Sequence, residues 1–179
     1  MATPIVDGST PLGVLIFQIP IDRIDDIMTN SSQWQEVGLG MTGETYLVGS
    51  DMTLRSNRRL FLEEPEDYLT LLKDKKKSQY TALIRNLGTA IGIDEIDSPS
   101  VKLALKGQSG YLSFVDYTGQ SILSAYTPID SGSAPWALVA EMTQDEAFKS
   151  YDLLKSDLFW RSFITIIVFL IIGVSDGFY

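Results

Sequence analysis

Two arginines near the middle of the chain, Arg55 and Arg58, have side chains that could bind a small acidic molecule. A guanidinium is the natural partner of a carboxylate, because its planar fork donates two charge-assisted hydrogen bonds. The alternative is that each arginine pairs inside the protein, with Asp51, Glu63 or Asp116, and stabilises its own loop. The sequence leaves both interpretations open.

Four acids around Pro65 could be taken for paired catalytic carboxylates: Glu63, Glu64, Glu66 and Asp67. Proline is favoured at the first position of a helix, and negative charge is stabilised near a helix N-terminus by the macrodipole. We therefore interpret these acids as the start of a helix and not as an active site.

The chain has no cysteine and no histidine. This composition excludes a Cys or His nucleophile or base, a Ser-His-Asp triad, and thiolate or imidazole metal sites. We predict no catalytic residue, no metal site and no cofactor. The alternative is a stand-alone hydrolase that works with carboxylates and has a buried C-terminal helix.

Length and charge limit the class of protein further. The 179 residues suit one domain with an appendage, and a hydrophobic content of 45% is enough for a core. The net charge is -9, and the one basic run, from Lys73 to Lys77, is interrupted by Asp74. A nucleic-acid-binding protein would show a basic face, so we expect no nucleic-acid partner.

Hydrophobic patterning predicts an α+β fold with an antiparallel sheet flanked by helices. The near-continuous apolar run from Pro11 to Pro20 predicts a central strand, and the turn at Asp7 and Gly8 predicts a hairpin in front of it. The other predicted strands are 44–49, 52–56, 111–117, 121–127 and 137–142, and the predicted helices are 21–28, 65–76 and 79–91. An early strand pair, a helical middle and a late meander are typical of α+β proteins.

A last helix is predicted to begin after Thr143, where Thr143 and Glu146 have the spacing of a capping box. Apolar residues then recur at heptad spacing, at Ala147, Tyr151, Leu154 and Leu158. This pattern indicates either a dimer seam or a stripe that packs on the same domain.

The helix continues into an uncharged run from Phe163 to Val174. We predict a truncated transmembrane helix, since a full span needs roughly 20 apolar residues. Trp160 and Arg161 stand where an interfacial aromatic and a snorkelling cation belong. A buried C-terminal helix is the alternative. The predicted division is therefore a domain of residues 1–157 and a truncated membrane segment with its tail at 158–179.

A glycine-rich stretch at Gly38, Gly40 and Gly43 permits a turn with positive φ before a strand. No helix or Gly-Lys-Ser/Thr follows it, so the phosphate-binding mechanism of a P-loop does not apply.

Three segments resemble the Cache family of extracellular PAS-like sensors. They are residues 11–28, residues 38–49 with Leu54, Arg55, Ser56 and Arg58, and a third set at residues 116–119, 123–128 and 136–141. The resemblance covers about Pro4 to Phe148. It implies a PAS-like antiparallel sheet flanked by helices and a sensing or relay role without catalysis.

The resemblance further implies the membrane-proximal module of a bacterial transmembrane receptor. The sensor domain would lie in the periplasm or outside the cell, as a homodimer, and signal to a cyclase, histidine kinase or chemotaxis output domain. In such a sheet a pocket would be lined by Tyr46, Arg55, Arg58, Tyr117 and Tyr126. We expect its ligand to be a small anionic or zwitterionic metabolite, with tyrosines adding stacking and hydroxyl contacts.

Overall fold

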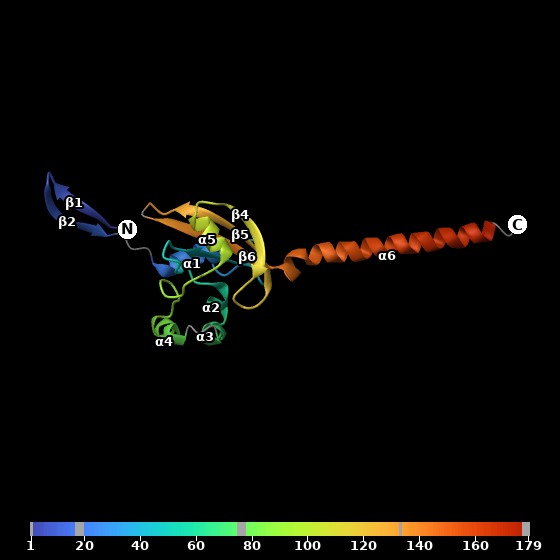
Figure 1. The fold of residues 1–179 in the computed structure, drawn as a ribbon, viewed down its shortest axis with the longest axis horizontal. Helices are drawn as coiled ribbons and strands as arrows, with labels where there is room; N and C mark the ends of the chain where they lie inside the picture. Colours follow the sequence, from blue (N-terminus) through green and yellow to red (C-terminus); the bar gives the residue numbers. More distant parts are fainter. Residues whose placement is uncertain (1, 17–19, 75–77, 133, 177–179) are drawn as a thin grey trace. The chain divides into compact units, whose positions relative to one another are not determined.

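The computed structural model describes residues 2–16, 20–74, 78–132 and 134–176 and has the α+β pattern that the sequence predicts (Figure 1). The chain divides into two compact units, Met1–Thr143 and Gln144–Tyr179. The predicted boundary after residue 157 falls inside the last helix and stays a prediction.

The main sheet of the first unit has four antiparallel strands in the order β3-β6-β5-β4. They are β3 (Glu44–Val48), β4 (Gly110–Val115), β5 (Ser121–Asp130) and β6 (Pro135–Thr143). More and less exposed side chains alternate along β4 and β6, which is the period of a sheet with one face against a core. These four predicted strands are confirmed.

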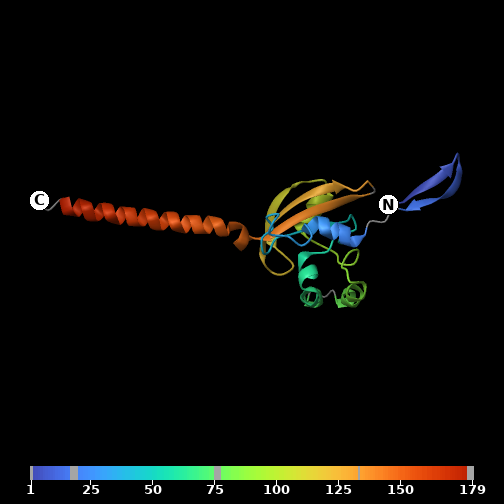
Figure 2. The ribbon, with the colours of Figure 1, turned by 180° about the vertical axis from the view of Figure 1, so that it is seen from behind.

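Five short helices accompany this sheet: α1 (Ile21–Thr29), α2 (Arg59–Glu63), α3 (Pro65–Asp74), α4 (Ser78–Leu87) and α5 (Pro99–Leu105). α5 packs against β5 and β6, and α3 lies beside α2 and α4 (Figure 2). The core between them includes Tyr46, Leu54, Tyr68, Ile84, Val101 and Val139. α1, α3 and α4 are the three predicted helices, and α3 begins at Pro65 as predicted.

The run at Pro11–Pro20 is not a central strand. Its residues 11–16 lie in β2 (Thr10–Ile16), which pairs with β1 (Ala2–Asp7) in a separate two-stranded sheet and is exposed along its length. Phe17–Ile19 lie outside the described residues. The turn at Asp7 and Gly8 is confirmed, since Asp7 pairs with Thr10 and Gly8 has a φ of 58°. The central positions of the main sheet belong to β6 and β5.

One further local prediction needs correction. Residues 52–56 form no strand; they make only the isolated bridges Val48 to Leu54 and Thr53 to Glu95. In α1 the most buried side chains are Asp25 and Thr29, whereas Ile27 is 78% exposed. Asp25 is retained inside because it accepts hydrogen bonds from the backbone and the side chain of Asn57, at 2.7 Å each.

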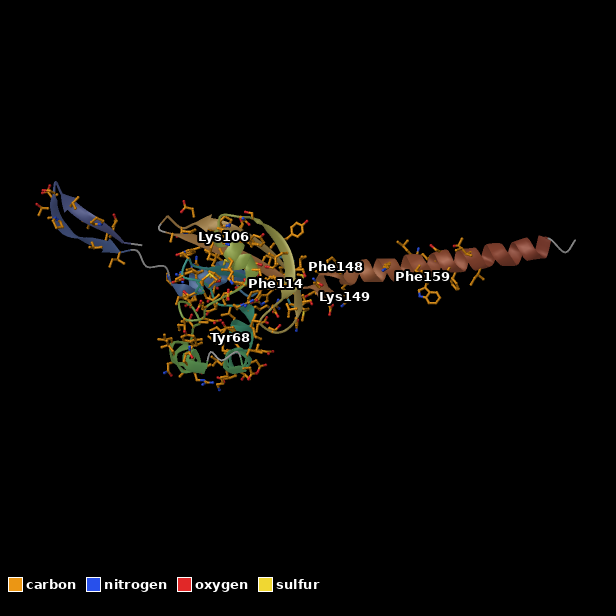
Figure 3. All side chains as sticks on the ribbon, viewed as in Figure 1. Tyr68, Lys106, Phe114, Phe148, Lys149 and Phe159 are labelled. Carbon is orange, nitrogen blue, oxygen red and sulfur yellow. The ribbon has the colours of Figure 1, made fainter. Side chains whose placement is uncertain are left out.

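The second unit is the helix α6 (Gln144–Asp176), which begins directly after Thr143 as predicted. In the predicted seam Ala147 is half-buried and Leu158 is exposed, and the side chains of Tyr151 and Leu154 lie outside the described residues. The exposed rings of Phe159, Trp160 and Phe163 contact one another. Figure 3 shows Phe159 on this helix. The described residues include no helix with the length and apolar character to span a bilayer.

Candidate functional site

The guanidinium of Arg58 is the centre of a buried ionic cluster. It bridges the carboxylates of Glu44 on β3 and Glu141 on β6, with 2.9 Å between Nη2 and Oε2 of Glu141 and 2.9 Å between Nε and Oε1 of Glu44. All three side chains are almost inaccessible, at 3%, 7% and 5% exposure. The internal pairing of Arg58 is therefore real, although its partners are not the acids expected from the sequence.

The register of the sheet explains why a cation stands here. Glu44 and Glu141 are directly opposite each other in the β3–β6 pair. Like charges at facing positions of a sheet repel, and a buried charge is tolerated only when it is paired. Arg58, at the N-terminus of α2, neutralises both acids at once.

Two tyrosine rings enclose this guanidinium. Its carbon lies 4.4 Å from the ring centroid of Tyr46 and 3.9 Å from that of Tyr117. Cation–π contacts of this kind are strongest when the cation is desolvated. The hydroxyl of Tyr46 donates to Glu141 at 2.9 Å, and that of Ser124 donates to the same carboxylate at 3.1 Å.

Burial and neighbouring charges act in opposite directions on the pKa values of this cluster. Burial raises the pKa of Glu141 and outweighs the opposing effect of Arg58. Burial acts to lower the pKa of Arg58, but Glu44 and the other surrounding groups hold that pKa well above its ordinary value. The pKa of Tyr46 and of Tyr117 is raised, chiefly by burial.

A cavity of about 380 Å³ opens beside the cluster. Tyr46, Arg58, Tyr117 and Glu141 form one wall. Residues 71–72 of α3, residues 94–99 and residues 114–116 form the remainder. The volume is within the range of small-molecule sites. Three of the five predicted site residues thus meet at one cavity.

Two polar groups of this wall have hydrogen-bonding capacity that the protein does not use. Among the described residues, Nη1 of Arg58 and the hydroxyl of Tyr117 make no hydrogen bond. Within the described residues, every fully buried side-chain nitrogen or oxygen has a partner, so neither of these two atoms is fully buried. Since both residues line the cavity, a ligand there would meet an open edge of the guanidinium and a phenol.

Arg55 and Tyr126 lie elsewhere. Arg55 forms an ion pair with Asp51 at 2.7 Å, which lowers the pKa of Asp51 to about 2, and its guanidinium lies 6.0 Å from the ring of Trp136. Tyr126 on β5 packs against the core, with its hydroxyl in the space left by the missing side chain of Gly110. Neither residue lines the 380 Å³ cavity.

A smaller cavity of about 190 Å³ lies on the other side of the same wall. Asp116, Tyr117 and Glu141 line both cavities, and Glu44 and Arg59 line the smaller one. The two cavities are therefore neighbours that share these three side chains.

The acids around Pro65 have structural roles. Glu63 pairs with Arg59 at 3.0 Å, Glu66 pairs with Arg85 at 2.6 Å, and Glu66 and Asp67 lie in the first turn of α3. Within the described ranges, no group of three or more acids is arranged to hold a metal ion.

The glycine-rich stretch of residues 38–43 contacts Arg59, the residue that follows Arg58 in the chain. Gly38 and Gly40 have positive φ as predicted, whereas Gly43 does not; a Cβ there would lie 2.1 Å from the carbonyl oxygen of Leu39. Arg59 donates to the carbonyl groups of Gly40 and Gly43 at 3.0 and 2.9 Å. The stretch therefore binds a cationic side chain of the protein through its carbonyl oxygens.

Sequence reasoning missed Glu44 and Glu141, which fix the position of Arg58. Each is an acid within an otherwise apolar strand, in Glu44–Val48 and in Pro135–Thr143. A charged residue at an inward position of a buried strand is a signal for a partner charge, and this signal was available.

The solved structures similar to this chain include the ligand-binding domain of the amino acid chemoreceptor PctB from Pseudomonas aeruginosa PAO1, in complex with L-Arg and with L-Gln. The sequence identities are 14% and 15%, and the TM-scores are 0.47 and 0.45. The matches cover 88% of this chain but only 48% and 52% of the solved chains, so the chain spans about half their length. No protein-family model and no curated protein matches the sequence. A likeness with TM-scores below 0.5 carries no argument about the family, ligand or mechanism of this chain.

Proposed function

We propose that this chain is a sensing or relay module of a bacterial transmembrane receptor, without catalysis of its own. The observation that carries the proposal is the 380 Å³ cavity, which is lined by Arg58 and Tyr117; among the described residues, Nη1 of Arg58 and the hydroxyl of Tyr117 make no hydrogen bond. The ligand is a small metabolite that accepts hydrogen bonds from these two groups. The sensor domain lies in the periplasm or outside the cell.

The signal leaves through β6. Glu141 lines the cavity, and two residues further on Thr143 ends the strand and pairs with Thr42, where the two hydroxyl oxygens are 2.9 Å apart. α6 begins at the next residue. A ligand that changes the position of Glu141 therefore acts on the strand that leads into this helix. In the receptor, α6 enters the membrane, pairs with the same helix of a second copy and reaches a cyclase, kinase or chemotaxis output domain.

Thermal denaturation of the full chain in a mild detergent tests the sensing role. The panel contains propionate, succinate, L-alanine, L-lysine and 1,4-diaminobutane. Because a ligand stabilises the state that binds it, a concentration of 100 times Kd adds about 2.7 kcal/mol to the free energy of unfolding. We expect at least one compound to raise the midpoint.

The matched variants are Tyr117→Phe and Tyr111→Phe. Each loses one hydroxyl, but Tyr111 is 80% exposed on β4 and does not line the cavity. The ligand-induced shift should fall in Tyr117→Phe and persist in Tyr111→Phe. A panel without any shift, or a shift that is the same in both variants, would contradict the proposed site.

A further inference from the structure

The buried cluster of Arg58, Glu44 and Glu141 is not balanced in charge. Two carboxylates meet one guanidinium, so one negative charge remains among three side chains that are almost inaccessible. Within the described residues, the only other cation that lines either cavity beside Glu141 is Arg59, and it forms an ion pair with Glu63. A buried charge without a partner is costly, and burial raises the pKa of Glu141 accordingly. The cluster therefore favours the uptake of one proton.

Among the described residues, no element packed around Glu141 supplies the missing positive charge. Tyr46 on β3 and Tyr117 after β4 have raised pKa values, which keep both phenols neutral. On α5, Lys102 forms an ion pair with Asp97. The remaining charged side chains described along the two cavity walls are acids: Glu44, Glu63, Asp94, Glu95, Asp97 and Asp116. The neighbouring elements thus leave the negative charge of the cluster in place.

Hydrogen bonding selects Glu141 over Glu44 as the proton acceptor. Glu44 accepts only from N–H groups, those of the Arg58 side chain and of the next backbone amide. An N–H group of this kind cannot accept a hydrogen bond in return. Oε1 of Glu141 instead accepts from two hydroxyls, that of Tyr46 at 2.9 Å and that of Ser124 at 3.1 Å. A hydroxyl can donate or accept, so a proton on this oxygen meets an acceptor.

The hydroxyl of Ser124 belongs to a buried chain that can run in either direction. It lies 2.6 Å from the hydroxyl of Ser100 on α5, both residues are fully buried, and either oxygen can be the donor. When Glu141 is ionised, Ser100 donates to Ser124 and Ser124 donates to the carboxylate. When Oε1 carries a proton, Glu141 donates to Ser124, which donates to Ser100. The fold therefore accommodates both forms of this carboxyl group.

We propose that Glu141 is a proton-operated switch: on acidification Oε1 takes one proton from water, and β6 is thereby released from Arg58. The carboxylate becomes a carboxyl group, and the cluster, with two negative charges and one positive charge before, becomes neutral. Nη2 of Arg58 is shared between Glu44 and Glu141. A charge-assisted hydrogen bond is roughly twice as strong as a neutral one, so protonation weakens the bond to β6 and leaves the guanidinium with Glu44 on β3.

The switch is a second input, separate from the ligand proposed above. Glu141 lies two residues before the end of β6, and α6 begins directly after that strand. A proton at Glu141 therefore acts on the same strand as a ligand in the cavity does, but it needs no ligand.

Nuclear magnetic resonance of the full chain in a mild detergent follows ¹³C-labelled glutamate carboxyls and backbone amides. The titration runs from about pH 8 down to the ordinary glutamate value of 4.5. We expect one carboxyl to titrate above that value, and the amides of residues 139–142 to shift with the same midpoint. In Glu141→Gln this carboxyl signal should disappear, and the amides at high pH should resemble the acid form of the unmodified chain, because glutamine is uncharged. Glu36→Gln, at an exposed residue, should retain both signals.

Ser124→Ala is a second variant that keeps the carboxylate. The ionised form loses a charge-assisted hydrogen bond and the acid form loses a weaker neutral one, so the midpoint should rise by roughly one pH unit. Ser121→Ala removes an exposed hydroxyl from the same strand and should leave the midpoint unchanged.

Three results would overturn the switch. The first is the absence of a glutamate that titrates above the ordinary value. The second is a set of β6 amide shifts that is the same in Glu141→Gln, which would assign them to another group such as Asp25, whose pKa is also raised by burial. The third is a titrating Glu141 without any shift of the β6 amides, which would show that β6 is not released. Ligand binding is measured separately, by thermal denaturation at one fixed pH.

Discussion

Replacing Arg58 with methionine should destabilise the first unit severely. Methionine keeps much of the length and apolar stem of arginine but removes the charge that neutralises Glu44 and Glu141. These two acids face each other across β3 and β6 with 7% and 5% exposure, so water replaces the guanidinium only poorly. Removing one partner of a buried ion pair typically costs about 3–5 kcal/mol.

Urea denaturation followed by circular dichroism gives the free energy of unfolding. For a protein of this size each kcal/mol corresponds to about 2–4 °C, so the melting temperature should fall by roughly 6–20 °C. Arg23→Met is the control, because the Arg23 side chain is 74% exposed and its contact with Asp26 is 3.9 Å long. Such a surface pair contributes about 0–1 kcal/mol.

Adding Glu44→Gln and Glu141→Gln to Arg58→Met should restore most of the lost stability, because no unpaired buried charge remains. Lower pH should act in the same direction. Since burial raises the pKa of Glu141, the folded state takes up a proton at a higher pH than the unfolded state, and stability increases as pH falls toward the ordinary value of 4.5. A loss below about 1 kcal/mol for Arg58→Met, or the absence of rescue, would refute the electrostatic account.

Other substitutions test single contacts. Gly43→Ala should cost about 1–3 kcal/mol in urea denaturation, because its Cβ would overlap the carbonyl oxygen of Leu39, whereas Gly13→Ala meets nothing within 4 Å and should be near neutral. Thr42→Val removes the hydroxyl that pairs with Thr143 and should lower the free energy of unfolding by about 1 kcal/mol. An unchanged free energy of unfolding would show that this contact does not stabilise the end of β6. Single cysteines at Tyr151, Leu154 and Leu158 should cross-link between copies in membranes more readily than at Asp152 or Ser156, and equal cross-linking would exclude the predicted seam.

The sheet could be predicted because its strands carry local signals. Residues 44–48, 110–115, 121–130 and 135–143 are rich in apolar and β-branched residues and are separated by turns such as Thr118 and Gly119. The helices α2 and α5 were missed because they have five and seven residues, fewer than two full turns. The side chain of Ser98 accepts from the backbone of Val101 and starts α5, but a lone cap before so short a run is a weak signal.

The exposure of the hairpin formed by β1 and β2 could not be predicted from its composition. Its apolar residues predict burial, yet Leu12, Val14 and Ile16 are 66%, 62% and 70% exposed. An apolar run indicates that a strand can be buried but not which sheet receives it. The turn residues Asp7 and Gly8 specify pairing with the neighbouring strand, and this local information was correct.

The site could be predicted only in part, because its arrangement depends on register. Nothing local in the sequence indicates that Glu44 and Glu141 face each other, and this pairing determines what Arg58 does. The two interpretations of Arg58, ligand binding and internal pairing, also prove to be compatible. Nε and Nη2 bind the two glutamates, whereas Nη1 makes no hydrogen bond within the described residues and Arg58 lines the cavity. A ligand bound at Nη1 would hold the same planar group that joins β3 to β6. By thermodynamic linkage, a ligand that stabilises the Arg58 bridge between β3 and β6 binds more tightly to the form of the sheet in which this bridge is intact.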